Sequence, residues 1–467
     1  MNAALGKIYE LSPVFVQNYI LTGYSAVLDR ERYGGRYHEY RELLSRSQSY
    51  SSQELRSYQD ERLKEMIQHA YATVPYYRTM FDERRLKPVD IRTQEDLQKL
   101  PLLTKEDIKK NFRALMSNKY KERNLKKGHT SGTTGTPLEI CYDPSAIYIT
   151  YAALDRQYQW ARCRLGRDGD RIAVARGNVI VPLSQQKPPF WRYNRYHNQL
   201  LLSSFHLSNE NMPFYFSEMR RYQPTVLDGY PSTLFILAKF LKSSGQKYPL
   251  KAVISSSETL YDFQREVIEE SFQCRIFDYY ALAERVVFAT ECEEHHGHHL
   301  SMEYGISEIL DDADAPVAKG TVGRLVGTSL HNFGMPLIRY VTNDRTAIKV
   351  ESCPCGRSLD LMEDVTTKAE DILILKDGRY ISPSVLTHPF KPLNSILESQ
   401  IIQKDYDRIF INIVPGKEFT QSEAQHLVSE FKKRLGADIS VTVQIVDTIP
   451  KSARGKFRWV ISEIPLQ

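Results

Sequence analysis

The sequence has no long apolar run, which excludes a membrane-spanning helix. Such a helix needs about 20 consecutive apolar residues, and no run in the 467-residue chain approaches that length. The opening stretch, Met1 to Tyr19, contains Glu10 and no small-residue cleavage site after an apolar core. It therefore does not resemble a secretory signal, and we expect no membrane span.

Cysteine and net charge are also scarce. Six cysteines in so long a chain are too few for a disulfide scaffold, which favours a reducing cytoplasm. The 62 basic and 57 acidic residues leave a formal net charge of only +5, so charge gives no reason to expect a nucleic-acid partner. With 42% hydrophobic and 25% charged residues, the composition predicts a globular protein of roughly two to three domains.

A third absence concerns phosphate binding. The run from His129 to Leu138 holds five hydroxyl side chains and two glycines, but no lysine follows its second glycine, which excludes the GxxxxGK[ST] pattern. Glycine lets the backbone bring N–H groups close to a ligand, and hydroxyls add donors for phosphate oxygens. A flexible linker is the alternative. The strand-like residues 138–142 that follow favour a loop between ordered elements.

Local patterns predict the class of the fold. Residues 1–110 look helical, with a capping box at Ser51-x-x-Glu54 and a helix that ends at Val74-Pro75. From about residue 165 apolar strands alternate with helices, which implies a parallel sheet that binds ligands at the carboxyl ends of its strands. We expect strands at 171–175, 225–227, 252–254, 275–279, 305–310, 323–328 and 336–340, and helices at 232–241 and 260–272.

The C-terminal residues predict a smaller unit. A hairpin over 371–381 would turn through a type I′ Asp377-Gly378, and Thr420-x-x-Glu423 caps a helix ending near Gly436. Further strands are expected at 396–403, 408–414 and 439–446. The predicted fold is therefore α/β, with a large N-terminal domain of parallel and mixed sheets and flanking helices, followed by a small α+β lid. Its divisions are a helical region at 1–110, a core at 111–365 and the lid at 366–467.

Four motifs, in order along the chain, carry a resemblance to a known family. After Thr130 to Pro137 come Tyr280-Ala281-Leu282-Ala283-Glu284, Tyr340-Val341-Thr342-Asn343-Asp344 and Gly455-Lys456. Their order and spacing resemble the adenylate-forming superfamily of acyl-CoA synthetases and adenylation domains. Within it, residues 72–78 and 100–105 resemble the phenylacetate–CoA ligase branch. Residues 187–194 and 202–208 resemble relatives from capsular-polysaccharide gene clusters.

The resemblance implies a two-step reaction. A small carboxylic acid attacks the α-phosphate of ATP, giving an acyl-adenylate and pyrophosphate, and a nucleophile then displaces AMP. The acceptor would be coenzyme A or an amine, and the setting surface-polysaccharide biosynthesis. Relatives often pair, so a homodimer is compatible with it. The phosphates would be held by Thr130, Ser131, Gly132, Thr133, Thr134 and Gly135.

The same resemblance assigns roles to later residues. Glu284 would hold Mg²⁺, Tyr280 would lie against the adenine, and Asp344 would accept hydrogen bonds from both ribose hydroxyls. Arg339 would lie beside the ribose. Lys456 would bridge the carboxylate and the α-phosphate from a lid that rotates between the two steps. The other expected AMP-binding residues are Ser257, Glu258, Asp278 and Tyr279, and the acyl pocket is expected near Tyr230, Ser256 and Ala281.

Each assignment has a structural alternative. Glu284 would then be a helix N-terminal carboxylate and Asp344 a turn residue. Arg339 would be an ion-pair former, and Lys456 a solvated lysine in the basic tail.

The chain also departs from the family pattern. Leu138 replaces the lysine that usually ends the phosphate loop, which leaves Lys126, Lys127 or His129 to supply a positive charge. Alanines stand at 281 and 283, Asn343 replaces a glycine, and residues 367–371 keep only the charge signs of the usual hinge pattern. These losses motivate a rival hypothesis, a catalytically retired nucleotide-binding or scaffold homologue. Retention of Glu284, Asp344 and Lys456 together argues against it.

A possible metal site lies outside these motifs. Cys353-Pro354-Cys355 forms a tight thiolate pair, and Cys292 with a nearby histidine completes a Cys₃His set suited to tetrahedral Zn²⁺. Four histidines follow Cys292. Some members of the ligase branch have a histidine four residues before a Glu-Tyr pair, which selects His299 over His295, His296 and His298. Such a site would be structural, because four protein ligands leave no open position. Unliganded thiols are the alternative.

Overall fold

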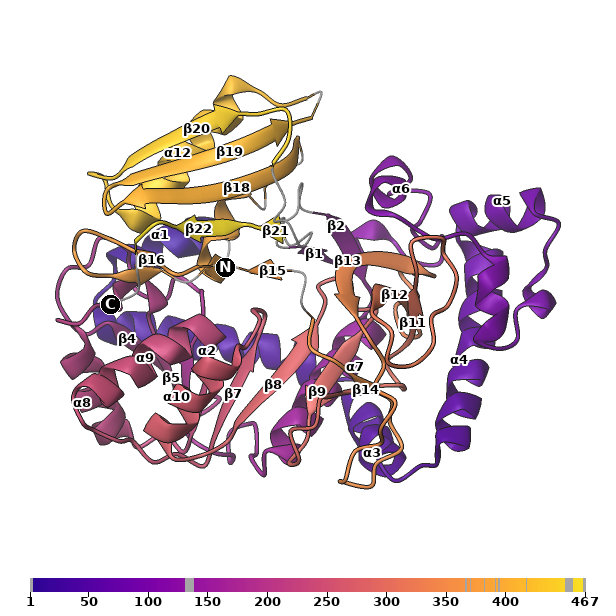
Figure 1. Cartoon of the computed structure of the whole chain (residues 1–467), viewed down its shortest axis with the longest axis horizontal. Coiled ribbons are helices and arrows are strands. Elements are labelled where there is room, and N and C mark those ends of the chain that lie inside the picture. Colours follow the sequence, from indigo (N-terminus) through magenta and orange to yellow (C-terminus); the bar gives the residue numbers. More distant parts are fainter. Residues whose placement is uncertain are drawn as a thin grey trace.

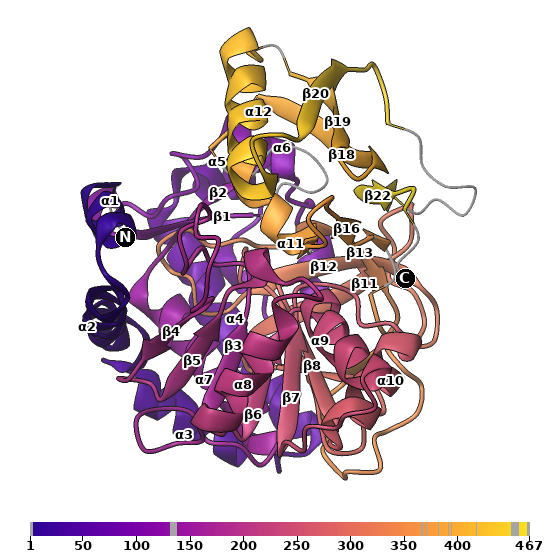
Figure 2. The same cartoon turned by 90° about the vertical axis from the view of Figure 1, so that its left-hand side faces the viewer.

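A computed structural model of the chain describes residues 3–130, 138–365, 368–369, 371–381, 383–390, 392–393, 395–416, 418–449 and 457–464. Figure 1 shows a large α/β body with the C-terminal elements above it, and Figure 2 shows the same arrangement from the side. In the described part of the chain, no helix is long and apolar enough to cross a membrane.

The first part of the chain is helical, as predicted. Its helices are α1 (Ala3–Leu11), α2 (Val14–Tyr33), α3 (Tyr37–Ser47), α4 (Ser52–Thr73), α5 (Pro75–Glu83) and α6 (Lys105–Lys110), with 3₁₀ turns at Pro88–Asp90, Glu95–Lys99 and Glu122–Asn124. The capping box of α4 is confirmed: the Ser51 side chain accepts from the Glu54 N–H, and the Glu54 carboxylate accepts from the Ser51 N–H. The helix ends before Pro75, which is the first residue of α5.

A nine-stranded sheet forms the centre of the body. Its order is β14-β10-β9-β8-β7-β6-β3-β5-β4. The strands are β3 (Ile172–Ala175), β4 (Trp191–Asn194), β5 (Gln199–Leu202), β6 (Val226–Gly229), β7 (Ala252–Ser256), β8 (Ile276–Ala281), β9 (Phe288–Glu291), β10 (His298–Leu300) and β14 (Leu361–Met362). The predicted parallel pairing is confirmed for β3, β6, β7 and β8. β5, which was not predicted, also pairs parallel with β3. The helices that accompany it are α7 (Pro144–Trp160), α8 (Met212–Tyr222), α9 (Pro231–Ser243) and α10 (Asp262–Phe272).

Two smaller sheets lie beside the large one. The strands β1 (Lys126–His129) and β2 (Glu139–Tyr142) pair antiparallel on either side of the hydroxyl-rich run. β11 (Gly305–Leu310), β12 (Gly323–Ser329) and β13 (Tyr340–Thr346) form an antiparallel sheet. The strand expected at 336–340 is therefore misplaced. Arg339 has a left-handed φ of 53°, which interrupts extended backbone, and the strand begins only after it.

The C-terminal unit, defined as the described residues from 368 to 464, contains a sheet ordered β20-β19-β18-β22. Its strands are β18 (Ile396–Asp405), β19 (Arg408–Pro415), β20 (Ser440–Ile445) and β22 (Val460–Ser462), and its helices are α11 (Pro383–Leu386) and α12 (Gln421–Leu435), with a 3₁₀ turn at His388–Phe390. β15 (Lys368–Ala369) pairs with β21 (Phe457–Arg458). The capping box predicted at Thr420 and Glu423 is confirmed. The domain boundary at 366 stays a prediction.

The predicted hairpin forms between β16 (Leu373–Ile374) and β17 (Tyr380–Ile381), but its turn is not type I′. That turn needs positive φ at both central residues, and only Gly378, at φ 76°, has it. The Asp377 carboxylate instead accepts from the Arg379 N–H at 3.1 Å. The hairpin also joins the two parts of the molecule, because the Tyr380 N–H donates to the Leu207 carbonyl at 2.8 Å.

Candidate functional site

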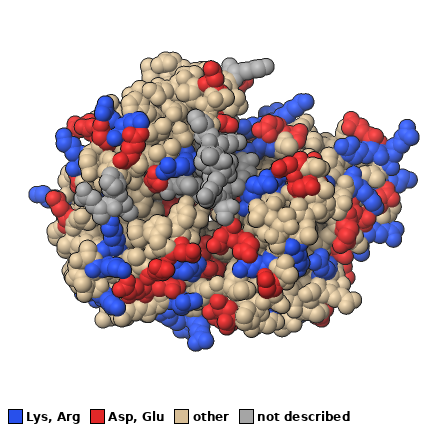
Figure 3. All heavy atoms as spheres, in the orientation of Figure 1, with Lys and Arg blue, Asp and Glu red and all other residues tan. Residues whose placement is uncertain are grey.

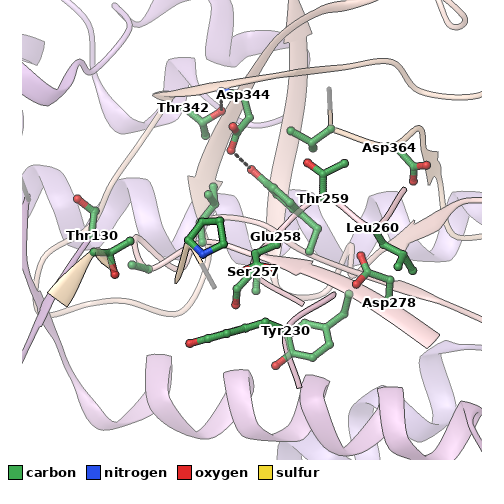
Figure 4. Close-up of a pocket in the computed structure, with 18 of the residues that line it drawn as sticks. Thr130, Tyr230, Ser257, Glu258, Thr259, Leu260, Asp278, Thr342, Asp344 and Asp364 are labelled. Atoms are coloured by element: carbon green, nitrogen blue, oxygen red, sulfur yellow. Dashed lines mark hydrogen bonds between the residues drawn. The ribbon is translucent and has the colours of Figure 1, made fainter. Parts of the chain in front are cut away.

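A cavity of about 480 Å³ lies at the carboxyl ends of the parallel strands and is also lined by residues of the C-terminal unit. Its wall combines residues from β1, β8, β13, the segment after β7 and the C-terminal unit. Figure 4 shows labelled side chains from β8, β13 and the segment after β7 around one space. The predicted nucleotide-site residues that line it are Thr130, Ser257, Glu258, Asp278, Tyr279, Tyr280, Glu284 and Asp344. Of the residues expected near the acyl pocket, Tyr230 and Ala281 line it and Ser256 does not.

Tyr280 and Asp344 meet at the upper side of this cavity. The Tyr280 hydroxyl donates a hydrogen bond of 2.7 Å to Asp344 Oδ2, drawn as a dashed line in Figure 4. Burial, together with the negative charge of Asp344, raises the pKa of Tyr280 well above its ordinary value. The phenol therefore keeps its proton and orients the carboxylate. A buried, oriented carboxylate suits a ligand that presents hydroxyl donors.

Glu284 occupies the neighbouring position and is only 6% exposed. The Tyr340 hydroxyl donates to Glu284 Oε1 at 2.8 Å, which leaves the carboxylate facing the cavity that it lines. Mg²⁺ in nucleotide sites is held by one or two carboxylates together with phosphate oxygens and water. An oxygen ligand in this position fits that requirement.

The segment after β7 is shaped by its backbone. Ser257 has a left-handed φ of 74°, which turns the chain across the carboxyl end of the strand. The Glu258 carboxylate then accepts from the Ser232 N–H at 3.0 Å, at the N-terminus of α9, where a negative charge is favourable. Glu258 thus joins this segment to α9 while lining the cavity.

Asp278 belongs to a charged group that the sequence analysis only partly found. His298 Nε2 lies 3.2 Å from Asp278 Oδ2, and His298 Nδ1 lies 3.3 Å from Asp364 Oδ1. Burial opposes a charge on His298, but the two carboxylates raise its pKa to about 10. Asp364 and His298 also line the cavity. No pattern in the sequence pairs them with Asp278, because they reach it from β10 and from the segment after β14.

Of the residues predicted to form the phosphate loop, the structure describes only the first, Thr130. Thr130 is buried, and its Oγ1 accepts from the Leu138 N–H at 2.9 Å. Ser131, Gly132, Thr133, Thr134, Gly135 and Lys456 lie outside the described residues, so their roles stay predictions.

Of the groups expected to supply a charge to this loop, only His129 lines the cavity in the described part of the chain. Lys126 lies 2.8 Å from Glu31 and Lys127 2.8 Å from Glu139. Lys105, at the start of α6, also lines the cavity and was not predicted.

Arg339 is placed in the ion pair that was its structural alternative. Its guanidinium lies 2.9 Å from Glu308 and donates to the Leu100 carbonyl at 2.7 Å. The side chain is 4% exposed and is not among the described residues that line the cavity. The geometry therefore gives no support to a position beside the ribose.

A second site lies away from the cavity. The ligand atoms of Cys292, His299, Cys353 and Cys355 all lie within 4.8 Å of one another. The Cys292 and Cys353 sulfurs are 3.6 Å apart, and Cys355 Sγ is 3.4 Å from His299 Nε2. A tetrahedral zinc centre with ordinary bond lengths has edges of about 3.8 Å between sulfurs and roughly 3.5 Å between sulfur and nitrogen. The cluster could therefore hold a metal ion.

The comparisons with known proteins agree with this architecture. Residues 373–463 match the family model of the CapK C-terminal domain. The chain is 26% identical over 465 residues to Protein CapK of Staphylococcus aureus, covering 98% of this chain and 100% of that protein. It is 24% identical over 456 residues to a phenylacetate-coenzyme A ligase of Thermus thermophilus, covering 88% and 96% of the two chains. This chain is similar over most of its length to CapK and to phenylacetate-coenzyme A ligases. The predicted resemblance is thereby confirmed.

A solved structure supports the fold independently. The crystal structure of 2-hydroxyisobutyryl-CoA ligase in complex with 2-HIB-AMP and CoA matches with a TM-score of 0.57 and 18% identity, covering 90% of this chain and 92% of that one. The predicted class, a large α/β part with a small C-terminal unit, is confirmed.

Proposed function

We propose that this protein is an adenylate-forming ligase, which activates a small carboxylic acid with ATP and transfers the acyl group to coenzyme A. The observation that carries the proposal is the convergence of Asp344, Tyr280, Glu284 and Thr130, from distant parts of the chain, around one cavity of about 480 Å³. That volume lies within the range of small-molecule sites, about 300–1,000 Å³. Homology to acyl-CoA ligases supports the same reaction class.

The chemistry proceeds in two balanced steps. A carboxylate oxygen bonds to the α-phosphorus of ATP as the bond to the β-phosphate bridge breaks, which releases pyrophosphate. The coenzyme A sulfur then attacks the acyl carbonyl, its proton leaves, and AMP departs.

In this scheme Asp344 fixes the ribose and Tyr280 orients Asp344. Glu284 would hold Mg²⁺, which when bound neutralises the phosphate charge. Lys456 would bring a positive charge to the α-phosphate. The cytoplasmic setting, a role in surface-polysaccharide synthesis and dimer formation stay predictions.

The decisive experiment is carboxylate-dependent ATP–pyrophosphate exchange over a broad acid library. We expect exchange with at least one acid, followed by thioester formation on addition of coenzyme A. If no thioester forms but an amide forms on addition of amines, the acceptor is an amine and not coenzyme A. A folded protein that binds ATP and supports exchange with no acid would favour the retired scaffold homologue.

We also propose that the Cys₃His cluster binds structural Zn²⁺. Three thiolates and Zn²⁺ carry a net charge of −1, and Arg357 lies nearby. Its guanidinium is 3.0 Å from Glu293 and stacks over Trp160 at 4.4 Å. Such partners outside the ligand set stabilise metal sites. The four ligands fill a tetrahedron, so the expected contribution is to folding.

A further inference from the structure

A partly buried polar cluster lies behind the lower end of the cavity. At its centre is Arg176, the first residue after β3. Its neighbours come from the carboxyl ends of the next parallel strands, with Asp228 from β6, Ser256 from β7 and Tyr279 from β8. Because these strands are adjacent in the sheet, their carboxyl ends bring the four side chains together.

The cluster is neutral overall. Arg176 Nε donates to Asp228 Oδ1 at 2.9 Å, and the Tyr158 hydroxyl donates to Asp228 Oδ2 at 2.8 Å. One positive and one negative charge therefore cancel. A second carboxylate or an ammonium on a ligand would add an unbalanced charge here, which is unfavourable once the ligand has displaced the water around the cluster.

The arginine has unused hydrogen-bonding capacity. A guanidinium has five N–H donors. Nε and Nη2 bind Asp228, Nη2 also donates to Tyr279 Oη at 3.3 Å, and Nη1 donates to Ser256 Oγ at 2.9 Å. One Nη1 hydrogen therefore has no acceptor among the described residues.

The cluster adjoins the cavity and is reached by solvent. The Arg176 guanidinium lies over the rings of Tyr230 and Tyr279, at 5.7 and 5.9 Å from their centroids. Both rings line the cavity, and Figure 4 shows Tyr230 on the side opposite Asp344. The side chains of Arg176 and Asp228 are 19% and 14% accessible. A small acyl group entering past Tyr230 would meet them.

We infer that Arg176 and Asp228 select acids that carry a neutral hydrogen-bonding group, such as a hydroxyl, on the acyl chain. A hydroxyl oxygen accepts from the open Nη1 hydrogen, and its proton is donated to a phenol oxygen. A methyl group in its place leaves those polar groups without partners once water is displaced. Sites built in this way discriminate strongly against analogues that lack the polar group. The inference rests on the proposed function and specifies its substrate class.

The test compares acids that differ only by hydroxyl and methyl. Suitable pairs are 2-hydroxyisobutyrate with pivalate, 3-hydroxybutyrate with 3-methylbutyrate, and 4-hydroxyphenylacetate with 4-methylphenylacetate. The best acid from the library, with its methyl analogue, completes the set. We expect kcat/KM for ATP–pyrophosphate exchange to favour the hydroxyl member by at least about 100-fold.

Variants assign the preference to the cluster. Arg176→Met should reduce the preference to within about threefold. Arg171→Met, the same change at the exposed start of the same strand, should leave it unchanged. If Arg176→Met fails to fold, Arg176→Lys and Ser256→Ala replace it in the test, because both keep a positive charge beside Asp228. Both variants should weaken the preference for the hydroxyl acid. ATP binding by each variant reports on its fold.

The outcomes separate the two proposals. A best substrate without a neutral polar group, or equal use of both members of every pair, would overturn the inference while leaving adenylation intact. A preference that survives in all folded Arg176 and Ser256 variants would also overturn it. Exchange with no acid at all would overturn the proposed function itself.

Discussion

The proposed role of Asp344 in binding ribose leads to a quantitative prediction for Asp344→Asn. The asparagine keeps the shape of the side chain and can still accept from the Tyr280 hydroxyl, but it loses the negative charge. The carboxylate is 9% exposed, so solvent screens its hydrogen bonds only weakly. A hydrogen bond to a charged group contributes about 1 kcal/mol more than a neutral one.

With two ribose hydroxyls, Asp344→Asn should therefore lose about 2 kcal/mol of the free energy of ATP binding, which corresponds to roughly a 30-fold increase in KM for ATP. The assay is ATP–pyrophosphate exchange at saturating acid, repeated with 2′-deoxy-ATP. Wild-type protein should lose affinity on removal of the 2′-hydroxyl, whereas Asp344→Asn should lose much less. Asp312→Asn, at a side chain that is 81% exposed, is the matched control and should behave as wild type.

The interaction energy of this double-mutant cycle shows whether Asp344 contacts the 2′-hydroxyl of the ribose. If the losses from Asp344→Asn and from deoxygenation simply add, Asp344 does not contact the 2′-hydroxyl and the assigned orientation of the nucleotide is wrong.

Three further predictions concern other parts of the molecule. Lys456→Ala should abolish adenylation while ATP binding, measured by calorimetry, changes little; normal exchange would remove its proposed role. Purified protein should contain about one zinc per chain by mass spectrometry. Cys353→Ser should lose the zinc and have a lower Tm, whereas the control Cys274→Ser should retain the zinc. A wild-type protein that is equally stable without metal would refute the site. Arg339→Met should cost about 3 kcal/mol of unfolding free energy, because it leaves the Glu308 carboxylate, which is only 12% exposed, without its partner. Combining it with Glu308→Gln should recover much of that loss, and an undiminished cost in the double variant would contradict the ion-pair explanation.

The mixture of charges over the surface is consistent with the composition. Figure 3 shows lysine and arginine side chains interspersed with aspartate and glutamate on this face. The small net charge predicted no nucleic-acid partner, and this stays a prediction.

Much of the fold was predictable because it depends on neighbouring residues. The capping box at Ser51 and Glu54 is a bond pattern within one helical turn, and the strand–helix alternation from 172 to 281 determines parallel pairing through the crossover rule. Arg339 shows the limit. Its left-handed backbone and its pair with Glu308 depend on β11, which no local pattern around residue 339 indicates.

The sequence by itself determined the motifs, their order and the set of candidate metal ligands, because each is a choice of side chain at a position. Only the tertiary structure decided which of them share a space. Packing of the sheets brings Tyr280 to Asp344 and Cys292 to Cys353. It also brings His298 and Asp364 to the cavity and Arg176 behind it. Contacts between residues so far apart in the chain arise from the folding of whole sheets, which local periodicity does not encode.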